Sequence, residues 1–559
     1  MKKFTLYLIA GVLLVSQSCK KSDLNKGAGQ DAVSLVSSPA GSNLKVNATT
    51  LYSTFRFISA NGGLSSQVSG QSLADGGVFT VAAYQGTAHQ QWRVTDVGNG
   101  YFTLMSNGSG KLATSYFYSG AQQLIQGSPD TANPDSQLWS LISVGNAKYK
   151  AINKASGLAI TSTGAGRLML LPYADNSTQW WGFNQLPDLT YRDDAVVNFF
   201  HRPKVTETTV AFDQGNSIPL SNGKVLWITQ DAWDAVQLQN NNAFACNGVS
   251  PYHNSALLQP SITNWDPLAT PNVTTTHSPG QPLQILATRP GLSWSWPGAG
   301  FELDGHVYLL CTEGGGGGNY FSTSDQVMYD LTMADGTNWA TAPVRKTIAG
   351  LSGQDMNEAY ITWTVGMADP KDGFVYVYGY YNYKPGTNPF ISHNSEVYVA
   401  RFPKTAEGVT NWTFWNGTSF VANLPVSEMK KIGSGKEGLS NVTVSYVNGK
   451  YVLLDMDYGF SCDPKKHTIA LATASSPTGP FTSFTTVYDI PDRFQGHVAQ
   501  YYTPLIHPEF VNGKNELLIT YCLNFYTACA STCTDGLDAT YYQIKGIRVP
   551  YSMVGIPNQ

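Results

Sequence analysis

Apolar and polar residues alternate in short stretches along most of this chain, and turns rich in glycine, asparagine and aspartate separate the stretches. Alternation with a period of two predicts half-buried β-strands, whereas an amphipathic helix needs a period near 3.6. From about residue 195 onward, no stretch of useful length has the helical period. The pattern predicts an all-β protein with two regions, 49–187 and 195–553.

In the first region the pattern Gln-x-Trp occurs three times, at 90–92, 137–139 and 179–181, in steps of 47 and 42 residues. A fixed period of this size marks repeated supersecondary units. One such unit has too little core to be stable alone. We therefore expect three lobes that bury Trp92, Trp139 and Trp181 around a pseudo-threefold axis.

This repeat resembles the ricin-type β-trefoil lectins, also called carbohydrate-binding module family 13, and the likeness covers about 140 residues. The resemblance implies that Gln and Trp are structural, while an early Asp, an aromatic platform and a polar residue hold sugar. Here the Asp position aligns with Thr114 and Thr161. Tyr84 and Tyr173, each six residues before a repeat glutamine, are the candidate sugar platforms. The other interpretation is a scaffold that binds nothing.

The second region repeats one hairpin five times, each time around Asn-Gly or Asp-Gly. These dipeptides favour tight hairpins because both central residues adopt positive φ. A third strand follows each hairpin, and in three units Thr-Asn-Trp comes next, at 263–265, 337–339 and 410–412. Five sheets of three or four strands predict a five-bladed β-propeller. The expected hairpins are 218–228, 301–310, 361–378, 442–454 and 508–520, and the expected third strands are 256–258, 327–331, 397–401, 469–473 and 544–549.

Two phrases of this region, 474–481 and Asp335-Gly336 followed by Trp339, resemble the five-bladed propellers of glycoside hydrolase family 43 and of related families that include arabinan-degrading enzymes. The resemblance implies hydrolysis by two carboxyl groups at the start of inner strands. One protonates the leaving oxygen, and the other activates water or attacks carbon. It also implies a third carboxylate that orients or tunes the acid.

Acidic residues just ahead of the predicted hairpins are the catalytic candidates. Asp213 precedes the first hairpin and is the expected general base or nucleophile. Glu437 precedes the fourth, where the resemblance implies the general acid. Glu358, with Asp355 as the rival, opens the third blade and is the expected third carboxylate. Acids at strand ends also bond to backbone amides or face water, so each keeps a structural alternative.

Further residues near the strand ends are candidates for holding substrate. Asp231 and Trp233 end the first hairpin, and His507 and Glu509 belong to the fifth. Trp294 and Trp296 either form a sugar platform or pack between blades, because aromatic rings serve both purposes.

The first residues are typical of an export signal. A charged start, Met1-Lys2-Lys3, precedes the apolar run 4–15, which is too short to span a bilayer. The run leads to Ser18-Cys19, which resembles a lipoprotein signal with Cys19 as the lipidated residue, although an ordinary cleaved signal peptide is the alternative. Residues 20–48 are polar and lack aromatics, as expected for a flexible tether. We expect an exported protein anchored in a bacterial outer membrane by acyl chains.

The amino-acid composition limits the kinds of partner and metal that the protein can bind. Charged residues make up 13% of the chain and the net charge is −4 without a basic patch, which excludes nucleic acid as a partner. Six cysteines after Cys19 permit up to three disulfides of undetermined pairing. A zinc site is the rival, but only Cys529 and Cys533 lie close together. No cofactor is required, a structural calcium ion stays open, and we expect a monomer.

Together these observations predict a surface glycoside hydrolase that acts on an extracellular polysaccharide, with an arabinose-containing one among the candidates, and that is aided by a carbohydrate-binding module. The alternative is a glycan-binding protein or adhesin without catalysis. A polysaccharide lyase is a third option, which no residue pattern favours.

Overall fold

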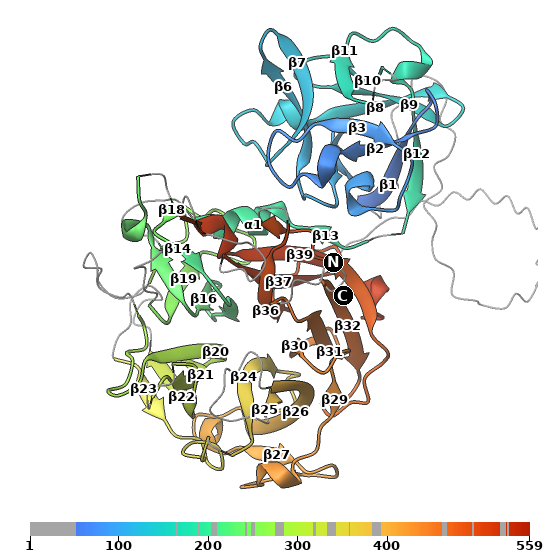
Figure 1. Ribbon diagram of the computed structural model, residues 1–559. Coiled ribbons are helices and arrows are strands. Elements are labelled where there is room, and N and C mark those ends of the chain that lie inside the picture. Colours follow the sequence, from blue (N-terminus) through green and yellow to red (C-terminus); the bar gives the residue numbers. More distant parts are fainter. Residues whose placement is uncertain are drawn as a thin grey trace, which may run out of the picture.

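A computed structural model of the chain describes residues 52–163, 166–187, 189–202, 209–240, 243–246, 252–273, 284–316, 320–332, 342–356, 358–382, 393–460, 467–494, 497–525, 533 and 536–559. The export signal with Cys19, the tether 20–48 and the Thr-Asn-Trp at 337–339 lie outside these residues. A β-trefoil sits on one side of a ring of five sheets (Figure 1). The predicted fold class, a trefoil followed by a five-bladed propeller, is confirmed. No helix in this described part is long and apolar enough to cross a bilayer.

Each trefoil lobe contributes four strands. Six strands close a barrel in the order β1, β4, β5, β8, β9, β12, and three hairpins, β2–β3, β6–β7 and β10–β11, cover one end of it. The lobes are β1 (Tyr52–Ser59), β2 (Ser65–Val68), β3 (Phe79–Ala82) and β4 (Trp92–Gly98); β5 (Tyr101–Ser106), β6 (Leu112–Tyr118), β7 (Ala121–Gly127) and β8 (Trp139–Gly145); β9 (Lys148–Asn153), β10 (Ala159–Ser162), β11 (Leu168–Leu171) and β12 (Trp181–Leu186).

The Gln-x-Trp repeat holds each lobe together. Each tryptophan opens a barrel strand, is at most 3% exposed, and donates its indole N–H to a backbone carbonyl of the neighbouring hairpin. The Gln137 amide bonds to the backbone at Asp130 and Ser128 and to the Thr114 hydroxyl, and Gln179 bonds in the same way to Thr161. Thr114 and Thr161, which occupy the position of the sugar-binding Asp, therefore serve the structural glutamines.

The propeller is built from five sheets whose first strands face the axis. Inner strands of neighbouring blades contact one another from β15 through β20, β24 and β30 to β36. The blades are β15 (Asn216–Pro219), β16 (Val225–Thr229) and β19 (Ser255–Gln259); β20 (Trp294–Leu303), β21 (His306–Gly314), β22 (Thr323–Thr332) and β23 (Val344–Lys346); β24 (Tyr360–Ala368), β25 (Phe374–Asn382), β26 (His393–Pro403), β27 (Thr413–Trp415), β28 (Phe420–Val421) and β29 (Gly433–Ser434); β30 (Ser440–Val447), β31 (Lys450–Asp457), β32 (Thr468–Ala474) and β33 (Thr485–Asp489); β36 (Gln500–His507), β37 (Glu516–Asn524), β39 (Ile544–Pro550) and β13 (Tyr191–Arg192).

Short strand pairs accompany the blades: β14 (Thr209–Phe212) with β17 (Ala232–Asp234), β18 (Ala243–Phe244) with β38 (Leu537–Asp538), and β34 (Arg493–Phe494) with β35 (His497–Val498). Four of the five predicted hairpins and all five third strands are present where expected. The fifth hairpin is also present, but its inner strand lies before the predicted start at Pro508. At Asp304-Gly305 and Asn448-Gly449 both turn residues have positive φ, as expected. The inner strand of the fifth hairpin ends at His507, because Pro508 cannot donate to the ladder.

One element differs from the sequence prediction. Helix α1 (Asp194–Phe200) begins the propeller region and is capped by the Asp193 carboxylate. It buries Val196, Phe199 and Phe200 under the first and fifth blades. The helix is shorter than two full turns, so its apolar face has too few positions to produce a recognisable helical period.

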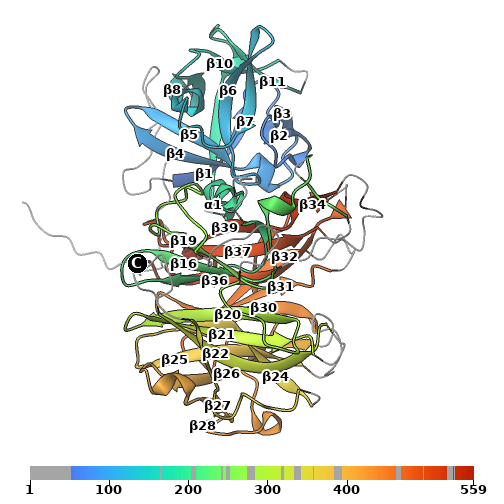
Figure 2. The same cartoon turned by 90° about the vertical axis from the view of Figure 1, so that its left-hand side faces the viewer.

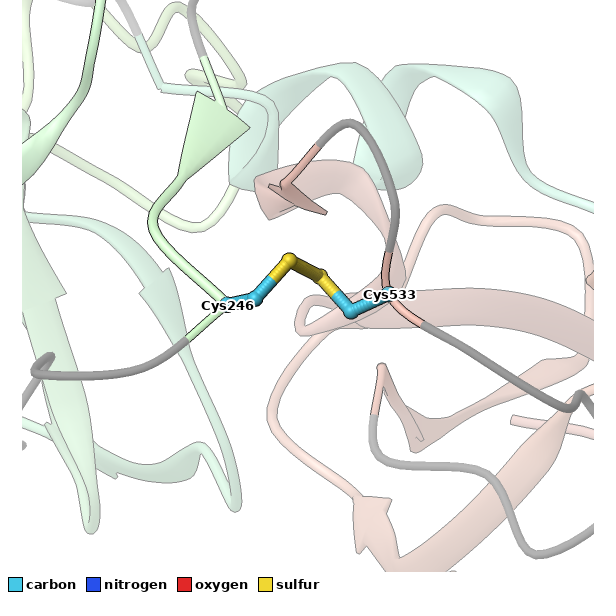
Figure 3. The surroundings of a disulfide bond; sticks show 2 residues. All are labelled: Cys246 and Cys533. Atoms are coloured by element: carbon cyan, nitrogen blue, oxygen red, sulfur yellow. A yellow bond between two sulfur atoms is a disulfide. The ribbon is translucent and has the colours of Figure 1, made fainter.

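Two separate contacts join the start of the propeller region to its last blade and so close the ring. Strand β13 comes from the start of the propeller region and forms the outer strand of the fifth blade beside β39 (Figure 1). A disulfide joins Cys246, after β18 of the first blade, to Cys533, ahead of β38 (Figure 3). Cys311 and Cys522 are buried free thiols, and Cys462 and Cys529 lie outside the described residues. The first and last blades are therefore joined by backbone hydrogen bonds and by a covalent bond.

Figure 2 shows the trefoil above β39 and α1. Buried charged groups join the two domains there. Arg93 of β4 pairs with Glu516 of β37, and the Tyr191 hydroxyl donates to the same carboxylate at 2.9 Å. Lys111 reaches Asp194 at 3.2 Å. Gly110 is required here, because a Cβ would lie 2.4 Å from the carbonyl oxygen of Arg192. This close, paired contact fixes the trefoil on the propeller.

Candidate active site in the propeller funnel

A cavity of about 430 Å³ opens at one end of the propeller axis. Every blade contributes to its lining, including Asp231 from the first, Trp296 from the second, Tyr380 from the third, Asn441 from the fourth and Tyr502 from the fifth. Its volume lies in the range that is typical of small-molecule sites. The inner strands therefore form a funnel, as the propeller fold predicts.

Asp213 lines the funnel from the link between β14 and β15. Its backbone bonds to Gln230 and Asp231, which places the two aspartates on adjacent segments. Its Oδ2 accepts hydrogen bonds from Tyr502 at 2.5 Å and Tyr542 at 2.7 Å. Burial, and after it the nearby charge of Asp231, raises the pKa of Asp213 from 3.8 to about 8. The group therefore carries a proton at neutral pH.

Asp231 lies just ahead of β17 and has different surroundings. Its Oδ1 accepts the indole N–H of Trp296 at 2.8 Å, and Nδ1 of His253 lies 2.9 Å from the same oxygen. Its side chain is 18% exposed, against 6% for the whole of Asp213. The funnel thus combines a carboxyl group that is buried and protonated with one that is partly exposed and held by N–H groups.

Aromatic side chains form much of the wall. The rings of Trp294 and Trp296 stack on each other, with centroids 3.8 Å apart and planes inclined by 12°. Trp294 is 1% exposed and donates to the carbonyl of Tyr320, so it mainly packs, whereas Trp296 orients Asp231. The structure thus combines both interpretations of the tryptophan pair, packing and lining of the site.

Several polar atoms of the funnel lining lack a partner within the described residues. Among them are Oδ1 of Asp213, Nε1 of Trp233 and Oγ1 of Thr312, each buried. Buried polar groups normally find a hydrogen-bond partner. A donor and acceptors that point to no protein group beside a cavity are suited to the hydroxyl groups of a ligand or to water.

The charge of the lining also restricts the ligand. Among the described residues that line the funnel, Asp213 and Asp231 are the only acids, and there is no lysine, arginine or histidine. The rest of the wall consists of neutral amides, hydroxyls, aromatic rings, aliphatic side chains and one proline. Such a wall has no cation to bind a carboxylate, sulfate or phosphate group of a ligand.

Glu437, Glu358 and Asp355 do not line this cavity. Glu437 lies in the loop before β30, where its backbone carbonyl accepts hydrogen bonds from Ser395 and Ser440. Glu358 and Asp355 are exposed in the loop before β24. Of the three expected catalytic acids, the structure places only Asp213 in the funnel.

His507 and Glu509 lie at the opposite end of the axis, where a second cavity of about 560 Å³ opens. Both contact Ser217, with 2.5 Å between its Oγ and Nδ1 of His507. Nε2 of His507 lies 2.7 Å from the Thr520 hydroxyl, and burial lowers the pKa of this histidine to about 3. Burial raises the pKa of Glu509 to about 7. These two residues therefore line a different cavity from Asp213.

The two expected sugar platforms of the trefoil are half-buried beside cations. The Arg56 guanidinium lies 4.4 Å from the ring centre of Tyr84, and the Lys150 ammonium lies 4.0 Å from that of Tyr173. One face of each ring is thus occupied.

For metals, the described part of the chain holds no group of three or more His, Cys, Asp or Glu side chains that could bind an ion.

Sequence reasoning missed Tyr502, Tyr542 and His253. Tyr502 precedes a β-bulge in β36 and Tyr542 lies in a loop before β39, so no local motif marks them. His253 follows a β-bridge between Ala232 and Tyr252, which brings it to Asp231 across 22 residues. These partners become visible only when the ring of blades is closed.

The fold and the site define an all-β protein with a lectin-like trefoil and a five-bladed propeller whose funnel holds a carboxyl pair. Residues 193–549 match the family described as "Domain of unknown function (DUF5005)". The chain belongs to this family. Residues 43–128 match a second model, described as "Ricin-type beta-trefoil lectin domain-like".

Three solved structures illustrate the similarity. One, titled "putative hydrolase" from Bacteroides ovatus, is 16% identical, with 64% of this chain and 90% of that chain covered and a TM-score of 0.49. The designed threefold-symmetric protein ThreeFoil is 27% identical over 24% of this chain and 99% of its own, with a TM-score of 0.23. A ricin B-like lectin of Macrolepiota procera, solved with lactose, is 14% identical over 25% and 100%, with a TM-score of 0.21. No curated protein matches the chain.

Proposed function

We propose that the funnel hydrolyses glycosidic bonds of an extracellular polysaccharide, with Asp213 and Asp231 as the carboxyl pair. The observation that carries this proposal is the pair itself: two carboxyl groups on adjacent segments, in unlike surroundings, that line a cavity walled largely by aromatic rings. Glycoside hydrolysis needs one group that donates a proton and one that is a base or nucleophile, and unlike environments assign these roles.

Asp213 is the general acid in this proposal. It holds a proton at neutral pH, and its Oδ1 has no hydrogen-bond partner in the described part of the chain. The proton passes to the leaving glycosidic oxygen as the bond between that oxygen and the anomeric carbon breaks. Asp213 was expected to be the base, but burial and the charge of Asp231 favour the acid role.

Asp231 is the base or nucleophile. Trp296 and His253 hold its Oδ1 from two sides, so its carboxylate has a fixed orientation. It either takes a proton from a water that attacks the anomeric carbon or attacks that carbon itself, after which water releases the sugar. In both routes the sugar gains the hydroxyl of water and the leaving group keeps the proton from Asp213.

For the trefoil we propose a carbohydrate-binding role that keeps the enzyme on its polysaccharide. The match to a lectin-like domain model supports it. We also propose that lipid on Cys19 anchors the protein in the outer membrane. Membrane fractionation of cells with wild-type protein or a Cys19→Ser variant tests the anchor, because the variant should leave the membrane fraction.

One observation favours the alternative of glycan binding without catalysis: both carboxyl groups belong to the first blade, and among the described residues no acid of a later blade lines the funnel. The test is the release of reducing ends from a panel of arabinan, xylan, galactan, mannan and β-glucans. We expect one glycan to be cleaved, with Asp213→Asn and Asp231→Asn at least a thousandfold slower and Glu437→Gln within a few-fold of wild type. Retention of a glycan without cleavage would leave only the binding role.

A further inference from the structure

The second trefoil lobe has a hairpin that is longer than those of the other lobes. Strands β6 and β7 have seven residues each, whereas β2, β3, β10 and β11 have four. The hairpin closes on a two-residue turn, Ser119-Gly120, in which both residues have positive φ. Figure 1 shows it on the side of the trefoil away from the propeller. The trefoil core does not require this extension, since the other lobes are complete without it.

The extra residues of β6 are three exposed aromatics. The strand is covered as far as Ser115, and then Tyr116, Phe117 and Tyr118 are 51%, 63% and 61% exposed. Exposing three consecutive large rings forgoes the free energy of their burial, about 1.5–3 kcal/mol for a side chain of this size. Contiguous exposed apolar surface of this kind marks an interaction site.

Tyr116 and Tyr118 form one platform because they are two residues apart on one strand and so point to the same face. Their ring centres lie 6.4 Å apart and their planes differ by 17°. Across the hairpin, Tyr118 faces Ala121, whose small side chain leaves the ring uncovered, and Tyr116 faces Gln123. Phe117 points to the opposite face of the hairpin.

Polar groups that can bond to hydroxyls border this platform. Gln123 is part-exposed, and its Oε1 accepts a hydrogen bond from Arg167 at 2.9 Å. Residues 112–127 contain no charged side chain. An uncharged strip with an amide at its border complements an uncharged ligand, whereas an anionic lipid surface is recognised by clusters of lysine and arginine.

We propose that Tyr116 and Tyr118 form a binding platform for a neutral polysaccharide chain, whose successive sugar rings stack on the two tyrosines while their hydroxyls bond to Gln123 and Arg167. The platform lies outside the positions of Tyr84 and Tyr173. In the second lobe the position six residues before Gln137 is Thr131, so this lobe lacks the tyrosine of the other two and carries the pair on its hairpin instead. The proposal rests on the carbohydrate-binding role of the trefoil and does not require catalysis in the funnel.

The test is retention of the full chain on insoluble xylan, arabinan, mannan and β-glucan, in an Asp213→Asn background so that the polysaccharide stays intact. We expect Tyr116→Ala/Tyr118→Ala to bind at least tenfold more weakly to a retained glycan, since each stacked ring contributes on the order of a factor of two to ten. Phe117→Ala is the matched control and should bind like its parent. Because all three rings are exposed, circular dichroism and the melting temperature should be unchanged in every variant.

Four outcomes would overturn the proposal. Equal retention of the tyrosine variant and its parent would place binding elsewhere, as would the absence of retention on every glycan. An equal loss with Phe117→Ala, or tyrosine-dependent binding to phosphatidylethanolamine and phosphatidylglycerol vesicles in place of glycans, would assign the hairpin to a different partner. Cleavage by wild type with unchanged retention of the tyrosine variant refutes this proposal alone, whereas tyrosine-dependent retention without cleavage refutes only the hydrolase.

Discussion

The two oxygens of the Asp213 carboxyl group have unlike surroundings, and this difference decides its role. Two tyrosine hydroxyls occupy Oδ2, while Oδ1 has no partner among the described residues. A carboxyl group with one oxygen fixed and the other unbonded presents its proton in one direction. Catalytic acids with raised pKa values commonly arise from such burial beside a second carboxylate.

The pH profile of kcat/KM tests this assignment. Because the acid must be protonated and the pKa of Asp213 is about 8, kcat/KM should fall above pH 8, approaching tenfold per pH unit. Glu509, whose pKa is about 7, lies at the other end of the axis. A Glu509→Gln variant should therefore keep the same alkaline limb; a limb that moves with Glu509 would speak against Asp213 as the acid.

Trp296 is expected to act through Asp231 and not through packing alone. Trp296→Phe keeps a ring against Trp294 but removes the N–H that Asp231 accepts. Since a hydrogen bond to a charged group contributes about 1.5–3 kcal/mol, kcat should fall roughly 10- to 100-fold. Trp415→Phe, in the third blade away from the funnel, is the control and should leave kcat unchanged. Equal kcat values for Trp296→Phe and wild type would show that the bond does not matter.

At the scale of single residues, the sequence predicted some of the residues that line the funnel and missed others. Asp213, Asp231, Trp233, Trp294 and Trp296 all line the funnel, because they lie at or near the ends of strands that the turn pattern located. Glu437 and Glu358 do not line it, although they also flank inner strands. The loops before β30 and β24 decide their direction, and loop conformation leaves no periodic trace in the sequence.

At the scale of the elements, irregular pairing in three inner strands shapes the funnel. Pairing registers shift between Pro297 and Gly300 in β20, between Thr362 and Gly366 in β24, and between Tyr502 and Leu505 in β36. Bulges bend strands and redirect side chains, and they are common beside active sites. Thr364, Val365, Thr503 and Pro504 lie within these shifts and line the cavity.

The repeated strands and turns also explain why the fold could be predicted from the sequence. Asn-Gly and Asp-Gly mark turns by a backbone requirement, and Gln-x-Trp marks lobes by a side-chain requirement, so both leave traces in the sequence at fixed spacing. Strand β13 left none. It is two residues long and pairs with β39, more than 350 residues away in the chain.

Helix α1 should depend on a glycine of its neighbouring strand. A Cβ at Gly546 in β39 would lie 2.5 Å from Cγ1 of Val196. Gly546→Ala should therefore lower the free energy of unfolding by about 1–3 kcal/mol, measured by denaturant titration. Gly182→Ala is the control, because its nearest contact would be an ordinary 3.8 Å. Equal free energies of unfolding for the two variants would show that helix α1 shifts to accommodate the added methyl group without loss of stability.

At the scale of the whole molecule, contacts between the first and the fifth blade hold both the ring and the site together. Asp213 comes from the first blade, and Tyr502 and Tyr542 come from the fifth. The hydrogen bonds of the Asp213 carboxyl group therefore connect the first blade to the fifth, and the disulfide joins the same two blades. Opening the ring should change the site as well as the stability.

Cys246→Ala/Cys533→Ala tests that coupling. The disulfide joins residues 287 positions apart, so its loss should lower stability by about 2–5 kcal/mol, read as a lower melting temperature. We also expect a lower kcat/KM at a temperature where the variant is still folded. The buried free thiols offer a matched control, since Cys311→Ala removes a sulfur without opening the ring. Unchanged activity in the disulfide variant would separate the closure from the site.

The most direct measurement is a crystal structure of the Asp213→Asn variant with an oligosaccharide of a glycan that the wild type cleaves. We predict a glycosidic oxygen within about 2.6–3.2 Å of the side chain at position 213. The anomeric carbon of that bond should face Asp231. A sugar bound only on the trefoil or at the opposite end of the axis, with the funnel empty, would contradict the proposal that this carboxyl pair cleaves glycans.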